Sequence, residues 1–134
     1  MDKQLDILAF GAHPDDVELG CGGTIAKQVN LGSKIGIVDL TRGELGTRGS
    51  AEIRDKEAAL AAQILGVEFR HNMCFKDGFF QNDEVHQMEL VKIIQELDLL
   101  ILVLVIGIQT DLEMLVLQEL LELICIQQEK MNGF

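Results

Sequence analysis

The chain begins its first apolar run with Leu5-Asp6-Ile7-Leu8-Ala9-Phe10-Gly11-Ala12 and follows it at once with His13-Pro14-Asp15-Asp16. Because the apolar run predicts a buried β-strand, an imidazole and two carboxylates cluster at the carboxyl end of a strand. In open α/β sheets, ligands bind at that end. Histidine and aspartate together suit zinc or a related divalent ion. This stretch therefore predicts a metal-assisted hydrolase.

Further apolar runs alternate with segments of helical period, which predicts repeated βα units and a mainly parallel sheet. We expect strands over residues 5–12, 34–40, 67–71 and 99–106, and helices over residues 23–31, 51–65, 84–97 and 112–128. Ser50 and Asp83 are the expected N-caps of two of these helices, and Gly66 is an expected helix stop. The fold class is thus predicted to be α/β, a Rossmann-like three-layer sandwich in which residues 1–134 form a single domain.

Apolar positions at helical spacing predict which helical residues face the core. The residues expected to be buried are Ile53, Leu60, Ala61, Ile64 and Leu65 in one helix and Val85, Leu90, Val91 and Ile94 in the next. The helix over residues 112–128 is apolar on nearly every side, which is more than one core face needs. We therefore expect part of it to meet a partner, as in a homo-oligomer.

The composition is acidic, with 22 Asp and Glu against 11 Lys and Arg and a formal net charge of −11. Such a charge repels nucleic-acid backbones and anionic membrane surfaces, so we expect neither as a partner. No secretory signal is visible, and residues 99–106 are too few to span a bilayer, so a cytoplasmic location is expected. Cys21, Cys74 and Cys125 form no C-x-x-C pair, and we expect them to be reduced residues that fill the core.

Pro14 restricts the turn that carries the polar cluster. It forces His13 into an extended conformation and fixes its own φ, so the chain turns sharply out of the strand and side chains 13 and 16 can converge. We therefore assign His13 and Asp16 as metal ligands and Asp15 as a general base. The alternative is a turn in which Asp15 and Asp16 only cap the next helix, helped by Glu18 near its positive end.

A glycine-rich loop over residues 41–49 follows the second expected strand and converges on the same sheet edge. Arg42, Arg48 and Arg54 flank it. Arg54 falls in the first turn of a helix, where a cation opposes the helix dipole, which suggests a clamp on hydroxyl or carboxylate oxygens. The alternative is solvated pairing of these arginines with Glu44, Glu52, Asp55 or Glu57. Asp77, in a turn, either shapes that turn or faces a substrate.

The glycines of Gly20-Cys21-Gly22-Gly23 do not fit the dinucleotide-binding fingerprint, because its third glycine would fall at Ile25. We expect small residues here because a helix packs closely against the metal loop. A flavodoxin-like nucleotide or response module would explain the topology, but it would not explain Arg42-Gly43-Glu44 together with Arg54.

Four motifs occur in order: Gly11-Ala12-His13-Pro14-Asp15-Asp16-Val17-Glu18, Gly22-Gly23-Thr24-Ile25-Ala26, Leu40-Thr41-Arg42-Gly43-Glu44-Leu45-Gly46-Thr47-Arg48-Gly49 and Arg54-Asp55-Lys56-Glu57-Ala58-Ala59. Together they closely resemble the LmbE-like, or PIG-L, family of zinc-dependent N-acetylglucosamine deacetylases. The resemblance covers about residues 4–96. It is nearest to the bacillithiol-biosynthesis branch, which acts on N-acetylglucosaminyl malate.

The resemblance implies that His13 and Asp16 bind zinc and that Asp15 is the general base. It implies that Arg54 contacts the sugar, and the further expected substrate contacts are Asp77, Arg42 and Glu44. The expected reaction is hydrolysis of the acetamide of a small N-acetylated amino sugar, which yields acetate and a free amine.

The chain departs from this family near its end. An H-x-x-H-type segment after the fourth strand supplies the family's third zinc ligand, but residues 107–114 contain no histidine. From Leu97 onward, 38 residues hold 11 Leu, 5 Ile and a single basic residue. We therefore expect a domain that is C-terminally truncated relative to the family, with a divergent segment over residues 97–134 and, as a hypothesis, a slipped reading frame near residue 97. The alternative function is a weakly active or non-catalytic remnant that associates through its apolar C-terminal helix.

Overall fold

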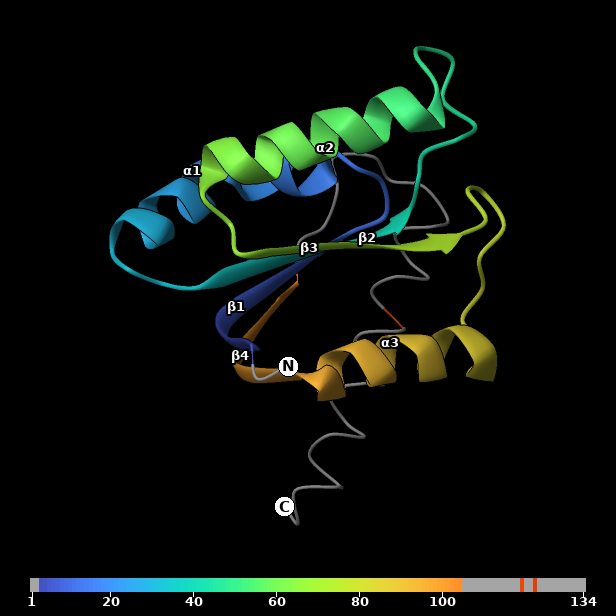
Figure 1. Ribbon diagram of the computed structural model, residues 1–134. Coiled ribbons are helices and arrows are strands. Elements are labelled where there is room, and N and C mark those ends of the chain that lie inside the picture. Colours follow the sequence, from blue (N-terminus) through green and yellow to red (C-terminus); the bar gives the residue numbers. More distant parts are fainter. Residues whose placement is uncertain (1–2, 105–118, 120–121, 123–134) are drawn as a thin grey trace.

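The computed structural model of the chain describes residues 3–104 together with residues 119 and 122. The elements in chain order are β1 (Lys3–Gly11), α1 (Asp16–Asn30), β2 (Ile35–Thr41), α2 (Ala51–Leu65), β3 (Phe69–Phe75), α3 (Glu84–Glu96) and β4 (Leu97–Leu104). α1 and α2 cover one face of the sheet and α3 covers the other (Figure 1). The three-layer α/β fold is therefore confirmed. Apart from residues 119 and 122, the helix expected over residues 112–128 lies outside the described residues, as does Cys125.

The strands form one parallel sheet in the order β3-β2-β1-β4. The chain steps outward from β1 to β2 and β3, and then returns to place β4 on the other side of β1. The direction of winding thus reverses next to the carboxyl end of β1. Ligands bind in open α/β sheets at such a reversal, so the topology points to the loop that follows β1.

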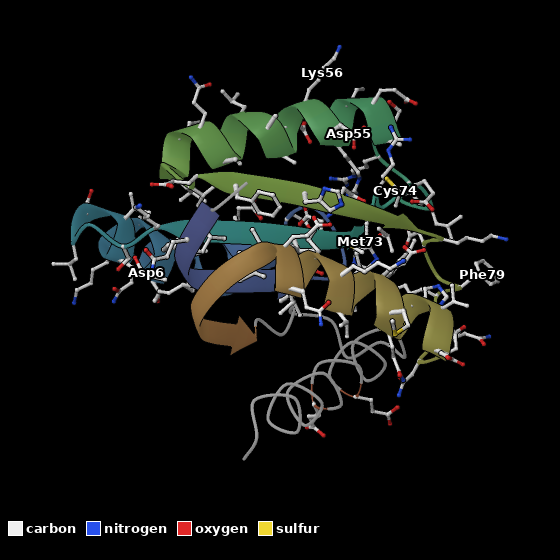
Figure 2. The ribbon with its side chains drawn as sticks, turned by 60° about the horizontal axis from the view of Figure 1, so that its bottom comes forward. Asp6, Asp55, Lys56, Met73, Cys74 and Phe79 are labelled. Carbon is white, nitrogen blue, oxygen red and sulfur yellow. The ribbon has the colours of Figure 1, made fainter. Side chains whose placement is uncertain are left out.

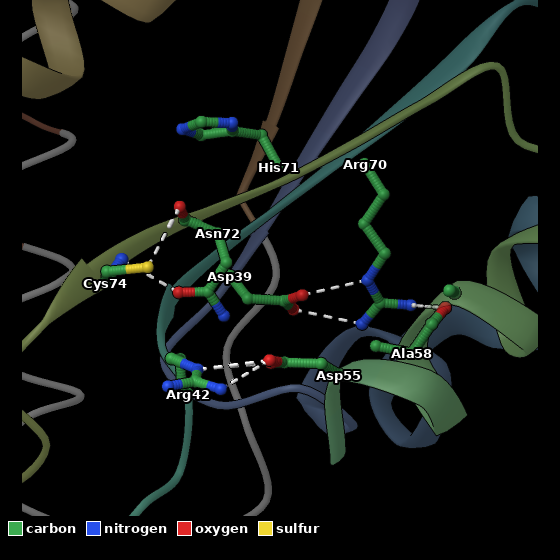
Figure 3. Close-up of a pocket in the computed structure, with 9 residues that line it drawn as sticks. Asp39, Arg42, Asp55, Ala58, Arg70, His71, Asn72 and Cys74 are labelled. Atoms are coloured by element: carbon green, nitrogen blue, oxygen red, sulfur yellow. Dashed lines mark hydrogen bonds and ion pairs between the residues drawn. The ribbon is translucent and has the colours of Figure 1, made fainter. Parts of the chain in front are cut away.

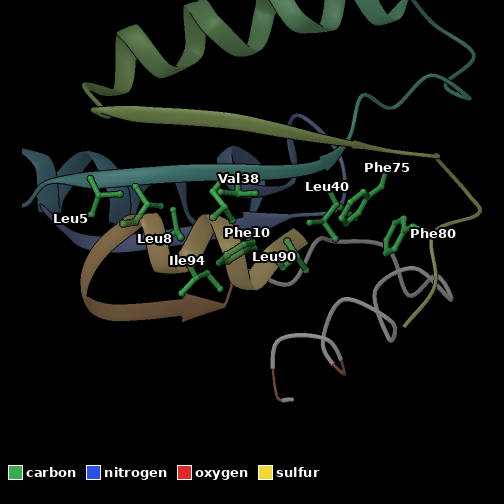
Figure 4. Packing of buried hydrophobic residues seen from close by; sticks show 12 residues of the cluster. Leu5, Leu8, Phe10, Val38, Leu40, Phe75, Phe80, Leu90 and Ile94 are labelled. Atoms are coloured by element: carbon green, nitrogen blue, oxygen red, sulfur yellow. The ribbon is translucent and has the colours of Figure 1, made fainter. Parts of the chain in front are cut away.

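Both faces of the sheet are covered by apolar side chains. Every residue of β2 is buried, as its lack of alternation predicts for a strand covered on both sides. On the α3 face, Leu8 and Phe10 pack with Leu90 and Ile94 (Figure 4). On the α1 face, the buried cluster consists of Ala9, Val17, Ile25, Ile35 and Ile37. The two layers hold β1 in the middle of the sheet.

The first helix begins earlier than the sequence predicts. α1 starts at Asp16 rather than near residue 23, so its glycines lie inside the helix, which is kinked at Cys21 (φ −148°, ψ 21°). Acidic Asp16 and Glu18 in the first turn favour this start because their negative charges interact favourably with the positive end of the helix dipole. A Cβ atom added at Gly22 or Gly23 would meet nothing within 4 Å. Our expectation that close packing requires small residues at these two positions was therefore wrong.

The second helix has the predicted ends but not the predicted core face. Ser50 accepts a hydrogen bond from the Ile53 N–H, and Gly66 ends α2 in a left-handed conformation. No residue of α2 is buried, however, and Ile53, Leu60 and Ile64 are 49%, 56% and 77% exposed. Because α2 lies over β3, the edge strand of the described sheet, fewer neighbours surround it than surround α1.

Two smaller differences concern other side chains. Val85 is 67% exposed, whereas Leu90 and Ile94 are buried in α3 as predicted. Cys21 is half-buried and Cys74 is exposed, so Cys74 does not fill the core.

No helix in the described part of the chain is long and apolar enough to cross a membrane.

A buried ionic cluster joins four elements on the α1 and α2 face. Arg70 of β3 donates from Nε and Nη2 to the two carboxylate oxygens of Asp39 of β2, at 2.8 and 3.1 Å (Figure 3). Its Nη1 also donates to Glu18 of α1 and to the carbonyl oxygen of Ala58 of α2. Burial raises the pKa of Asp39 to about 6, although Arg70 acts to lower it. At pH 7 Asp39 is therefore ionised and paired.

Replacing Gly36 tests how tightly the sheet packs. A Cβ atom at this position would lie 2.7 Å from Leu5 Cδ1 and 2.9 Å from Leu8 Cδ1, and both leucines are fully buried. We expect Gly36→Ala to lower the free energy of unfolding by about 1–3 kcal/mol in urea denaturation. Gly23→Ala, at an open helical position, is the control and should raise it by up to about 1 kcal/mol. Equal effects of the two substitutions would contradict the packing described here.

Removing Arg70 tests the ionic cluster. Arg70→Met leaves the carboxylates of Asp39 and Glu18 without their shared cation, so we expect the free energy of unfolding to fall by about 3–5 kcal/mol. The matched control is Arg42→Met, because Arg42 forms an exposed pair with Asp55, and this substitution should change stability little. An Arg70→Met protein as stable in urea as the parent would show that the cluster does not hold the fold.

Candidate active site

The loops after β1, β2 and β3 meet at the carboxyl edge of the sheet. Thr41, at the end of β2, donates from its backbone N–H and from its hydroxyl to the Ala12 carbonyl oxygen, at 3.0 and 2.9 Å. Its hydroxyl oxygen also accepts from the Gly43 N–H at 3.1 Å. Thr41 thereby joins the start of the glycine-rich loop to the corner that carries His13.

The corner itself is a tight turn that brings His13 back toward Asp16. The His13 carbonyl oxygen accepts from the N–H groups of Asp15 and Asp16, at 2.9 and 3.2 Å. A Cβ atom at Gly11 would lie only 3.1 Å from Asp16 Cβ, so glycine allows the turn to fold over the strand end. Asp16 Oδ2 accepts from the His13 backbone N–H at 2.9 Å and lies 3.4 Å from His13 Nδ1.

The other nitrogen of the same ring contacts a residue 64 positions away. His13 Nε2 lies 3.0 Å from Asp77 Oδ1, and Asp77 Oδ2 accepts from the Leu45 N–H at 3.0 Å. The Asp77 N–H in turn donates to Glu44 Oε1 at 2.8 Å. Asp77 is only 5% exposed. Its carboxylate therefore joins all three loops of the site.

These carboxylates give the corner a negative potential. The hydrogen bond to Asp16, with the charges of Asp16 and Asp77, raises the pKa of His13 to about 9 in spite of burial. Burial acts to raise the pKa of Asp16, but hydrogen bonds from His13 outweigh it and leave that pKa below its ordinary value. Partial burial and the charge of Asp16 raise the pKa of Asp15, although its side chain keeps contact with water. The carboxylates of Asp16 and Asp77 thus favour the protonated form of the His13 ring.

The two side chains fit adjacent corners of a metal tetrahedron. Nitrogen and oxygen ligands bind zinc at about 2.0–2.2 Å, so two tetrahedral ligand atoms lie about 3.4 Å apart. The observed separation of His13 Nδ1 and Asp16 Oδ2 is 3.4 Å. Within the part of the chain that the structure describes, no group of three His, Cys, Asp or Glu side chains is placed to hold a metal ion. His13 and Asp16 are therefore two candidate ligands, and their role in metal binding remains a prediction.

Asp15 and Arg54 lie beside this pair. Asp15 is exposed and occupies the N-cap position of α1, yet its side chain makes no capping hydrogen bond, so the capping alternative is wrong for Asp15. The guanidinium of Arg54 lies against the glycine-rich loop, where a Cβ atom at Gly46 would come within 2.7 Å of Arg54 Nη2. The charge of Arg54 acts to lower the pKa of Asp15. The structure thus brings this cation and this carboxylate to one side of the corner.

The other residues predicted to contact substrate already have partners in the protein. Arg42 Nη2 lies 2.6 Å from Asp55 Oδ2, as the pairing alternative predicts (Figure 3). The Asp77 N–H donates to Glu44 Oε1. A hollow of about 250 Å³ opens beside Arg42, among residues of β2, α2 and β3. The two arginines in its wall, Arg42 and Arg70, are each paired with an aspartate. Substrate contacts by Arg42, Glu44 and Asp77 remain predictions.

One cluster near the site, which consists of Glu18, Asp39 and Arg70, was not identified from the sequence. Arg70 binds Glu18 in the first turn of α1, two residues after Asp16, and anchors it to Asp39. A signal was present, because Asp39 and Arg70 are oppositely charged residues within two strands, and buried charges require partners. The cluster therefore fixes the start of α1, which carries the candidate metal ligand.

Comparison of the amino-acid sequence with known proteins identifies relatives of this chain. The profile of the PIG-L family, GlcNAc-PI de-N-acetylase, matches residues 8–111, which include every predicted site residue and extend past residue 96, where the motif resemblance ended. The uncharacterized deacetylase YaiS of Escherichia coli is 42% identical over 76 residues, covering 57% of this chain and 40% of that protein. The diacetylchitobiose deacetylase of Thermococcus kodakarensis is 33% identical over 98 residues, covering 67% and 36%.

A solved structure agrees with these sequence matches. The conserved protein TT1542 from Thermus thermophilus is 46% identical and superposes with a TM-score of 0.65, covering 69% of this chain and 42% of that one. The chain thus spans about two fifths of the length of these relatives. Because the family profile matches more than half of the chain and the folds agree, the chain belongs to the PIG-L, or LmbE-like, deacetylase family.

Proposed function

We propose that the chain is a zinc-dependent hydrolase that removes the acetyl group from an N-acetylglucosaminyl substrate. The observation that carries the proposal is the 3.4 Å separation of His13 Nδ1 and Asp16 Oδ2, with Asp15 next to them in the same turn. Family membership supports the reaction class. The resemblance carried by the four motifs is nearest to the bacillithiol branch, so N-acetylglucosaminyl malate is the substrate to test.

In this proposal His13 and Asp16 hold the metal ion. When bound, a divalent ion would supply Lewis acidity, which makes a water molecule more acidic and polarises the acetamide carbonyl. Asp15 accepts a proton from the attacking water as the new carbon–oxygen bond forms. It then returns that proton to the departing nitrogen as the carbon–nitrogen bond breaks. The products are acetate and the free amino sugar.

Arg54 binds the sugar in this proposal. Its position in the first turn of α2 opposes the helix dipole, and its guanidinium is held against the glycine-rich loop beside Asp15. A planar fork of donors can bind two hydroxyl oxygens of a sugar or a carboxylate of an attached acid. The substrate would thereby be oriented with its acetamide over the corner.

Substitutions at the corner separate metal binding from proton transfer. We expect His13→Ala to lose bound zinc, measured by elemental analysis of the purified protein, because one of the two ligands is gone. We expect Asp15→Asn to keep zinc but to release acetate from N-acetylglucosaminyl malate about 10²–10⁴-fold more slowly. Lys56→Ala, on the exposed side of α2 (Figure 2), is the control and should match the parent in both measurements.

Two results would contradict the proposal. A parent protein that binds no zinc and releases no acetate would support the non-catalytic remnant instead. An Asp15→Asn protein that releases acetate at the parental rate would exclude Asp15 as the base.

Substitution of Arg54 tests the sugar contact. Hydrogen bonds to a charged group contribute about 1.5–3 kcal/mol, so we expect Arg54→Met to raise KM about 10-fold or more. The control is Arg48→Met, which removes an exposed arginine of the glycine-rich loop and should leave KM unchanged. An unchanged KM in Arg54→Met, with acetate release intact, would exclude Arg54 from substrate binding.

A further inference from the structure

We propose that Asp77 is a positioning residue of the metal site, whose carboxylate turns the His13 ring so that Nδ1 faces a bound divalent cation together with Asp16. The inference rests on the proposed function, because it concerns the same metal site. It assigns Asp77 a role within the protein, through His13, in addition to the substrate contact predicted from the sequence.

The contact between Asp77 and His13 determines which nitrogen of the His13 ring can bind a metal ion. An ionised carboxylate only accepts hydrogen bonds, and Asp77 Oδ1 lies 3.0 Å from His13 Nε2. Nε2 must therefore carry the hydrogen of this bond. A histidine that binds a metal does so as a neutral imidazole, which has one protonated nitrogen, so with Nε2 protonated a bound cation would be left with the lone pair of Nδ1. Nδ1 is also the nitrogen that lies 3.4 Å from Asp16 Oδ2.

The carboxylate of Asp77 is itself held on both sides. Its second oxygen accepts from the Leu45 N–H at 3.0 Å, and its own N–H donates to Glu44 Oε1 at 2.8 Å. The side chain is only 7% exposed, so water competes little for these bonds. Each carboxylate oxygen of Asp77 has a different donor. A rotation of the Asp77 side chain that released His13 would therefore also leave the Leu45 N–H without this acceptor.

The end of β3 is shaped to deliver Asp77 to this position. The Asn72 side chain donates to the Thr41 carbonyl oxygen at 2.7 Å and accepts from the Cys74 N–H at 2.8 Å. Cys74 has φ 56°, which is uncommon for a residue other than glycine. These contacts fix the last residues of β3 against the end of β2. Asp77 then points back to the corner, while Phe79 in the same turn projects outward (Figure 2).

Carboxylates that accept from the far nitrogen of a metal-binding histidine have a known energetic effect. They fix the tautomer and the ring orientation and raise the basicity of the ligand, and their removal lowers metal affinity about 10–100-fold. The effect should be large here because the described part of the chain holds no group of three metal-ligating side chains, so binding would depend strongly on the orientation of His13.

The test is zinc binding to the whole chain carrying Asp77→Asn. An amide offers an oxygen to only one of the two donors, His13 Nε2–H and the Leu45 N–H, and turns an NH₂ group toward the other. We expect the dissociation constant for zinc, measured by competition with a chromophoric chelator, to rise about 10–100-fold. An unchanged dissociation constant would overturn the inference.

The matched control is Asp83→Asn, because Asp83 forms a second aspartate–histidine pair away from the corner. Asp83 Oδ1 lies 2.6 Å from His86 Nδ1 and caps α3. Asparagine also caps helices well, so the fold should tolerate the change. We expect the zinc dissociation constant of this variant to equal that of the parent. An equal loss in both variants would mean that Asp77 acts through general stability, which would overturn the inference.

Nitrogen NMR of the parent protein provides a measurement that does not depend on a variant. With zinc bound and the histidines labelled with ¹⁵N, His13 should be protonated at Nε2 and metal-bound at Nδ1. A proton on Nδ1 with zinc at Nε2 would overturn the inference and leave the proposed function standing. Failure of the parent to bind zinc at all would instead reject the proposed function, and the inference with it.

Discussion

The structure depends on one imidazole held between two carboxylates at the carboxyl end of the central strand. His13 meets Asp16 within its own turn and Asp77 from a loop 64 residues away. The parallel sheet makes this possible, because the carboxyl ends of β1, β2 and β3 lie along one edge. The short contact between the first and third loops therefore follows from the strand order.

Charged contacts of two kinds occur at and next to the turn that carries His13. At the corner itself, the carboxylates of Asp16 and Asp77 both contact the His13 ring. Next to it, Arg70 pairs with both Asp39 and Glu18 and so fixes the first turn of α1 to the sheet. The strongly acidic chain thus places one of its few arginines between Asp39 of the sheet and Glu18 of α1.

The sequence predicted the fold and the corner well, for physical reasons that particular residues show. Strand-like apolar runs, the Ser50 cap and the Gly66 stop are local signals, and the ends of α2 agree with them. The early start of α1 was missed because glycines lower helix propensity, while the favourable charges of Asp16 and Glu18 act only once the helix exists. The exposed face of α2 was missed because sequence period does not reveal that a helix covers an edge strand.

The roles of Asp77 and Arg70 could not be predicted from spacing for a different reason. Both act across long sequence distances, on His13 and on Glu18, and only the sheet order brings these pairs together. Local patterns identify a turn at Lys76-Asp77-Gly78 and a charged residue in a strand, but not their partners. Sequence reasoning therefore identified the residues proposed to face the metal and missed the arginine that holds the helix behind them.

The most direct test of the account is a crystal structure of the zinc-soaked protein with anomalous scattering recorded at the zinc edge. The account predicts an anomalous peak in bonding contact with His13 Nδ1 and Asp16 Oδ2, with Asp77 Oδ1 still within hydrogen-bond distance of His13 Nε2. A peak bound elsewhere, or the two side chains turned apart with no peak between them, would contradict it.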